Sequence, residues 1–124
     1  MARKEHMLAK EKRTSMTPGE KREYNRLMRI YKSLPANKLA VAEGLIRQAA
    51  RLRDRLDKLW EDLQVYGETE LFSQSPNTEP YERERPSSRT FTATDKSYQA
   101  IIKQLNELCP ESQAKDALED FLKG

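Results

Sequence analysis

The sequence predicts an all-α protein built around a long antiparallel helical hairpin, with a basic helix before it. A seam of apolar residues recurs at alternating spacings of three and four between residues 42 and 66, over more than three heptads. A shorter amphipathic segment returns ahead of Pro110. Apolar residues make up only 36% of the chain and charged residues 35%, which favours exposed helices over a large globular core.

The first helix is predicted to begin at Thr17. The segment TPGE places a hydroxyl side chain at the N-cap, proline at the first helical position and glutamate three residues after the cap. Helical spacing continues to about Leu34, and Pro35 then ends the helix. The preceding residues, 1–16, show no sustained period and are interpreted as a flexible basic arm.

The second helix is expected to begin near Ala36 or Asn37 and to end at Tyr66, with Gly67 as its C-terminal cap. Together with the first helix it forms a segment, 17–66, to which we assign DNA binding and oligomerisation. The seam of this helix consists of Ala42, Leu45, Ala49, Leu52, Leu56, Leu59, Leu63 and Tyr66.

Residues 67–93 form a polar loop with three prolines. Two arrangements are consistent with this loop: it lacks regular structure, or its segments TELFS and SRTFT pair as a small β-hairpin. A returning helix of the hairpin is predicted over residues 94–110. A C-terminal amphipathic helix is predicted within residues 111–124.

The predicted returning helix is about half as long as the central helix, so it is expected to cover only the seam around Leu56 to Leu63. The half from Ala42 to Leu52 then needs the first helix or another subunit, because large apolar side chains are costly to leave in water. Self-association, in a ring-like assembly, is the simplest expectation. The candidate subunit contacts are Ala42, Leu45, Ala49, Leu52 and Trp60.

The sequence offers no recognisable catalytic or metal-binding arrangement. The single histidine, His6, has no second ligand near it, and the single cysteine, Cys109, has no neighbouring base. One cysteine excludes an internal disulfide and fits a reducing, intracellular compartment. We therefore expect no enzyme activity, no cofactor, no metal and no small-molecule substrate. No run approaches the ~18 apolar residues of a membrane span, so no membrane partner is expected either.

Positive charge is concentrated in the N-terminal half. Residues 1–53 contain 14 Lys and Arg against 5 Asp and Glu, whereas residues 54–124 contain 9 against 15. Two interpretations stay open for this half: an ordinary solvated surface, or contact with a nucleic-acid phosphate backbone. The candidate nucleic-acid-binding residues are Arg3, Lys4, Lys10, Lys12, Arg13, Lys21, Arg22, Arg26, Arg29 and Lys32.

The block LPANKLAVAEGLIRQAARLRDRLDKLWEDLQVYGETELF, the polar loop after it and the segment SYQAIIKQLNELCP resemble the small terminase subunits of tailed bacteriophages and prophages. The resemblance covers roughly residues 34–110. It rests on the long helix ending in a Gly-containing turn, the polar loop, and the amphipathic helix ahead of a proline. The chain departs from that pattern in lacking an Asn-Gly turn after Leu71 and Phe72.

This resemblance implies a ring-forming, non-catalytic DNA-packaging factor in the cytoplasm of a bacterial host cell. Such subunits bind double-stranded viral DNA, present it to the large terminase subunit and modulate that partner's ATPase and nuclease. By the same resemblance Leu118, Phe121 and Leu122 are candidates for docking the large subunit, with packing onto the chain's own helices as the alternative. The alternative functions are a helical nucleic-acid-binding regulator or nucleoid-type dimer, and a coiled-coil scaffold that binds protein alone.

Overall fold

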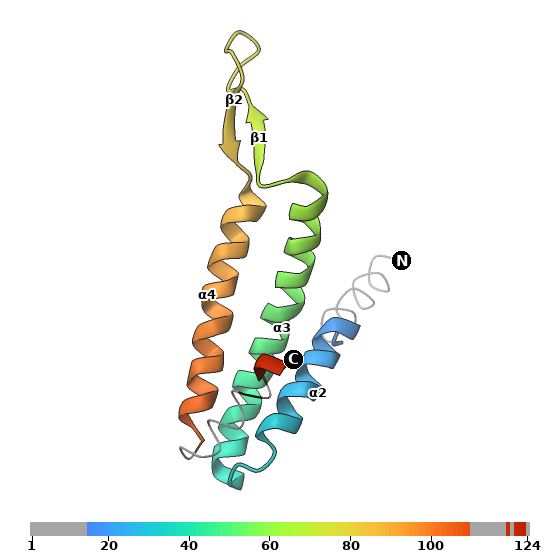
Figure 1. Ribbon diagram of the computed structural model, residues 1–124, viewed down its shortest axis with the longest axis vertical. Helices are drawn as coiled ribbons and strands as arrows, with labels where there is room; N and C mark the ends of the chain where they lie inside the picture. Colours follow the sequence, from blue (N-terminus) through green and yellow to red (C-terminus); the bar gives the residue numbers. More distant parts are fainter. Residues whose placement is uncertain (1–14, 110–118, 120, 124) are drawn as a thin grey trace, which may run out of the picture.

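The computed structural model describes residues 15–109, 119 and 121–123. These residues are mostly helical and include one small antiparallel sheet, so the all-α prediction is confirmed for the helices alone. Helices α3 and α4 run antiparallel and side by side, α2 lies along one half of α3, and the strands project beyond the opposite end (Figure 1). The elements are α2 (Pro18–Tyr31), α3 (Ala36–Tyr66), β1 (Thr69–Phe72), β2 (Tyr81–Glu84) and α4 (Pro86–Glu107).

Helix α2 begins as the sequence predicts. The Thr17 side chain accepts a hydrogen bond from the backbone N–H of Glu20 at 3.1 Å, and Pro18 occupies the first helical position. The helix ends at Tyr31, earlier than the expected Leu34. Leu34 lies in the following turn, where its N–H bonds to the Tyr31 carbonyl, and its side chain is nevertheless buried. Its apolar character therefore reflects the core and not a continuing helix.

Both predicted ends of α3 are confirmed. The helix spans Ala36–Tyr66 and is about 46 Å long at 1.5 Å per residue. At its end Gly67 has φ +82°, a left-handed conformation that only glycine adopts without strain. The Gly67 N–H donates to the Leu63 carbonyl at 2.8 Å and closes the last turn.

Helix α4 begins eight residues earlier than the predicted 94–110. Pro86 starts it, and Phe91, Thr94 and Tyr98 continue the apolar spacing of its later turns. Serine and threonine dominate this first part, and such residues disfavour a helical interpretation from sequence. In the structure the Thr92 hydroxyl donates to the Ser88 carbonyl one turn back, as hydroxyl side chains within helices often do.

The β-hairpin exists, but the sequence predicted only one of its strands. TELFS contains β1, whereas SRTFT lies inside α4, and the true partner strand is β2. The strands pair antiparallel with Thr69 opposite Glu84 and Phe72 opposite Tyr81. The intervening turn lacks an Asn-Gly pair, so nothing in the local sequence marked the second strand.

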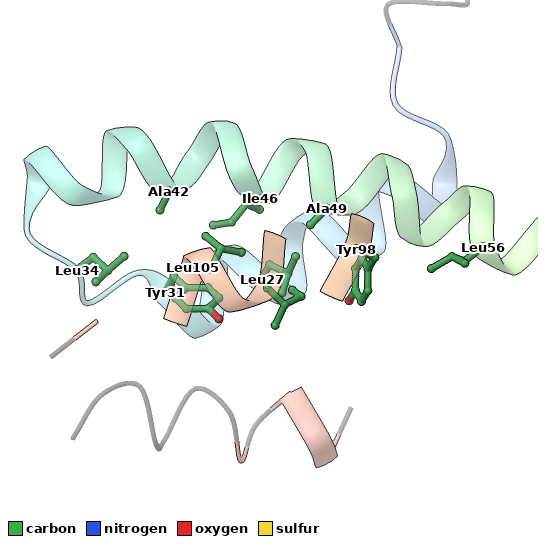
Figure 2. Close-up of a cluster of buried hydrophobic side chains, with 10 residues drawn as sticks. Leu27, Tyr31, Leu34, Ala42, Ile46, Ala49, Leu56, Tyr98 and Leu105 are labelled. Atoms are coloured by element: carbon green, nitrogen blue, oxygen red, sulfur yellow. The ribbon is translucent and has the colours of Figure 1, made fainter. Parts of the chain in front are cut away.

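The core lies where all three helices meet (Figure 2). The longer α4 covers the seam of α3 as far as Leu63, and α2 covers its N-terminal half from another side. The buried stripe on α3 is therefore wider than one heptad seam and includes Ile46 and Ala50, whereas Tyr66 is 68% exposed, contrary to expectation. The core residues are Leu27, Tyr31, Leu34, Ala42, Ile46, Ala49, Leu56, Tyr98, Ile102 and Leu105.

This packing corrects the expected subunit contacts. Ala42 and Ala49 are completely buried within the chain, so their side chains leave no surface for another subunit to contact. Leu45 and Leu52 are partly buried against the same core. Trp60 is 50% exposed, and its ring lies 5.7 Å from that of Phe91. The first helix and the longer returning helix together supply this cover, for which the sequence analysis left open the first helix or another subunit.

Candidate nucleic-acid interface

The outward face of α2 carries exposed cations. Lys21, Arg22, Arg29 and Lys32 are all exposed, and their side chains make no ion pair or hydrogen bond within residues 15–109. Lys21 and Lys32 are about three helical turns apart, and Arg22 and Arg29 are about two turns apart, which places all four on one side of the helix. This side is a compact positive surface with its hydrogen-bond donors free, as phosphate contact requires.

Arg26 differs from these four cations, because it is partly buried and bonded within the chain. Its side chain is 20% exposed, and its guanidinium holds Glu23 with two bonds, Nε to Oε1 at 2.6 Å and Nη2 to Oε2 at 3.0 Å. The Arg26 guanidinium also lies over the Phe121 ring, 5.1 Å from its centroid. Position 26 is at the border of the helical face, where α2 turns toward α4, and two of its three guanidinium nitrogens are bonded within the chain.

Glu23 is the partner that the sequence analysis missed. It is 5% exposed and accepts a further hydrogen bond from the Tyr98 hydroxyl of α4 at 2.6 Å. Burial acts to raise its pKa, but hydrogen bonds from Arg26 and Tyr98 and the charges of Arg26 and Arg53 outweigh burial, and the pKa is lowered. Its spacing of four and eight residues from buried Leu27 and Tyr31 is the one sequence signal of its inward direction.

A second hydroxyl joins the same two helices. Tyr31 of α2 donates to Asn106 Oδ1 of α4 at 2.7 Å, and burial raises the pKa of Tyr31 to about 12. In the other bond, Tyr98 of α4 donates to Glu23 of α2. Burial, and to a smaller extent the bond to Glu23, raise the pKa of Tyr98 as well. These two bonds fix α2 against α4, so the exposed cations of α2 are presented on a rigid support.

Most charges of α3 are paired with a residue one turn away along the helix. Asp54 bonds Lys58 at 2.9 Å and Asp57 bonds Arg53 at 3.1 Å. Arg51 reaches only Gln48, at 3.5 Å, and Arg55 pairs with no described residue. Both are exposed, and they add two positive charges to the solvent-facing side of α3.

Several candidate residues lie outside the described residues, namely Arg3, Lys4, Lys10, Lys12, Arg13 and Leu118. Of the other residues expected to dock the large subunit, Phe121 packs on the chain itself, 6.1 Å from the Tyr98 ring. Leu122 is 75% exposed. The C-terminal segment therefore has one side chain directed to the body and the next directed to solvent.

Metal-binding groups do not gather among the described residues: no three or more His, Cys, Asp and Glu side chains are placed to hold an ion. Burial raises the pKa of the half-buried Cys109 thiol, and a raised pKa makes a thiol less reactive. In the described part of the chain, no helix combines the length and apolar character of a membrane span.

Comparison of the chain with protein-family models, with curated proteins and with solved structures finds no match. The resemblance to terminase small subunits therefore rests on the sequence features alone.

Proposed function

We propose that this chain is the small subunit of a phage DNA-packaging terminase, a non-catalytic protein that binds duplex DNA through α2. The observation that carries the proposal is the row of unpaired, exposed cations Lys21, Arg22, Arg29 and Lys32 on one rigid helix. Such side chains neutralise backbone phosphates and release condensed counterions, which makes binding strong at low salt and largely independent of sequence.

The distribution of charge supports a defined orientation on DNA. The hairpin segment 68–84 holds five glutamates and one arginine, so the end opposite α2 repels a polyanion. A duplex is thus drawn to α2 and its neighbouring turns on α3. No side chain marks a base-reading role, and we propose contact with the backbone only.

Docking of the large ATPase–nuclease subunit is proposed for the C-terminal segment. Leu122 is available for such a contact because it is 75% exposed. Phe121 supports the alternative of packing onto the chain, since it already contacts Arg26 and Tyr98. Replacing Leu122 by Ala is expected to reduce stimulation of the cognate ATPase, and unchanged stimulation would remove this residue from the docking surface.

The duplex contact is tested by two matched double variants of the full chain. Arg29→Gln with Lys32→Gln removes two charges from α2, and Lys96→Gln with Lys103→Gln removes two exposed charges from α4. Plots of log affinity against log salt should become shallower by about 1.8 for the first variant, at 0.9 per lost phosphate contact, and stay unchanged for the second. Equal effects of the two variants would contradict a specific role of α2.

One observation favours a different function. Ala42 and Ala49 are buried within the chain, so its core does not require further copies. This fits a nucleic-acid-binding regulator or nucleoid-type dimer that has no motor partner. Duplex binding without any stimulation of a packaging ATPase would support this alternative.

A further inference from the structure

A cavity lies between the helices beside the buried Glu23. Its volume is about 540 Å³, and α2, α3, α4 and the C-terminal Phe121 and Leu122 contribute to its wall. The charged residues of this wall are Arg22, Glu23, Arg26, Arg53 and Asp57. Three guanidinium groups thus face two carboxylates, and the wall carries a surplus of one positive charge.

The carboxylates of this wall are already occupied. Both oxygens of Glu23 accept bonds from Arg26, and Oε2 also accepts from Tyr98. Asp57 is paired with Arg53 at 3.1 Å. Glu23 therefore has little acceptor capacity left, and Asp57 has its charge paired with Arg53, so the wall offers no unpaired carboxylate to a cationic ligand.

The donors, in contrast, are in excess. Arg26 Nη1 is buried and has no hydrogen-bond partner among the described residues. Arg22 is one helical turn away on α2 and is also unpaired within residues 15–109. A buried charged donor without an acceptor is unfavourable, and so are two like charges at this spacing on a helix. A bound anion would relieve both.

Two of the three guanidinium groups are held in place before any ligand arrives. Arg26 is fixed by two bonds to Glu23 and by the ring of Phe121. Arg53 is fixed by Asp57 and lies over the Tyr98 ring, 5.8 Å from its centroid. Fixed side chains lose little conformational entropy on binding, so the site is organised in advance.

We propose that this cavity binds one phosphate group of the DNA backbone, with Arg22, Arg26 and Arg53 as its donors. The inference rests on the proposed binding of duplex DNA and adds a defined pocket to an otherwise flat contact. A tetrahedral oxyanion accepts bonds from several guanidinium groups at once, and the planar fork of arginine suits phosphate. The pocket gives the duplex a fixed point relative to all three helices.

The first test uses inorganic phosphate as the probe and the full chain as the receptor. Phosphate is titrated calorimetrically against chloride at equal ionic strength, with the wild type, Arg22→Gln and Arg29→Gln. Arg29 is the matched control, because it is exposed on the same helix and does not line the cavity. Phosphate should bind the wild type and Arg29→Gln alike and bind Arg22→Gln at least fivefold more weakly. Equal weakening in both variants, or no binding beyond that of chloride, overturns the proposal.

The second test assigns the phosphate to DNA. Arg53→Gln lies on α3, outside the cation row of α2, and should make the salt dependence of duplex binding shallower by about 0.9. An unchanged slope with intact duplex binding overturns the cavity's role in DNA binding and leaves the proposed function standing. Phosphate binding by a wild-type chain that binds no duplex would contradict both.

Discussion

Glu23 is a charged residue whose environment is made by two other helices. Its carboxylate is buried at the contact of α2 with α4 and is held by Arg26 and Tyr98. Removing one partner of such a group leaves the others buried without a full set of hydrogen bonds. The cost of these unsatisfied groups exceeds the net stability that one hydrogen bond contributes. The cluster therefore stabilises the placement of α2 only as a complete set.

Replacing Glu23 by Gln is expected to lower the free energy of unfolding at pH 7 by about 2 kcal/mol, because Arg26 loses its ionic partner. The lowered pKa means that the charge of Glu23 stabilises the fold above its unfolded pKa of about 4.5, and that this stability is lost as the pH falls through the folded value. The variant should therefore lose less stability than the wild type between pH 5 and pH 3. Urea unfolding at pH 7 and between pH 5 and pH 3 measures both effects.

Glu61→Gln is the control, since Glu61 is exposed and unpaired among the described residues. If Glu23→Gln kept the acid sensitivity of the wild type, another carboxylate would be responsible for it.

Gly19 and Gly44 are both helical glycines, and the structure gives them different roles. A methyl group at Gly19 would collide with the Asp54 carboxylate, which Lys58 holds in place. Gly44 has open space around it. Gly44→Ala is expected to stabilise the chain by about 0.5–1 kcal/mol through helix propensity, whereas Gly19→Ala should give no gain or a loss. Thermal unfolding of both variants measures the difference.

The Gly19 prediction can be checked against its cause. In a chain that already carries Asp54→Ala, the obstacle is gone, and Gly19→Ala should become neutral or stabilising. A penalty that persisted in this background would place the strain in the backbone of α2 and not at Asp54.

The elements differ in how far the sequence predicted them. Thr17 and Gly67 were predicted because caps depend on a few adjacent residues. The start of α4 was missed because its serines and threonines are poor helix formers, and its helix is supported by Phe91 packing near Trp60. The inward direction of Arg26 was missed for a different reason: its partner Glu23 is held inside by the Tyr98 hydroxyl, which is distant in sequence and is placed by the tertiary fold.

The β-hairpin depends on its base for stability, because a two-stranded sheet alone is marginal in water. Arg85 supplies this base. Its backbone N–H bonds the Glu68 carbonyl at 2.8 Å, its Nη1 bonds the Gly67 carbonyl at 2.8 Å, and its Nη2 pairs with Asp62 at 3.0 Å. Its guanidinium also lies over the Tyr66 ring. One side chain thus joins the end of α3 to the end of β2.

Replacing Arg85 by Lys keeps the charge but cannot reproduce the forked contacts to Gly67 and Asp62. Amide hydrogen exchange over residues 69–72 and 81–84 should accelerate about tenfold, while exchange in the core of α3 stays unchanged. Arg89→Lys is the matched control, since Arg89 is 80% exposed and makes a single pair with Glu84 at 3.5 Å. Unchanged exchange in Arg85→Lys would show that the strands hold themselves together.

At the scale of the whole molecule, exposed apolar side chains lie chiefly at the end that carries the β-hairpin, called the hairpin end below. Among the described residues, Trp60, Val65, Tyr66, Leu71 and Tyr81 are large, hydrophobic and exposed there, whereas the seam from Ala42 to Leu52 is covered. Several large exposed apolar side chains at one end of a chain of this size favour an interaction surface there. If the proposed assembly forms, its contacts belong at this end, away from the cationic α2.

We therefore expect the full chain to be oligomeric and to lose that state when the hairpin end is made polar. Val65→Ser with Leu71→Ser should lower the mass measured by light scattering after size exclusion, because both side chains are more than 70% exposed and their loss removes apolar contact area without opening the core. Val41→Ser is the control, since Val41 is 59% exposed at the opposite end. An assembly unaffected by the double variant, or a wild-type chain that is monomeric, would contradict this prediction. The cations of α2 lie outside the altered surface, so each dissociated chain should still bind duplex DNA, and the loss of avidity would measure how much the assembly contributes.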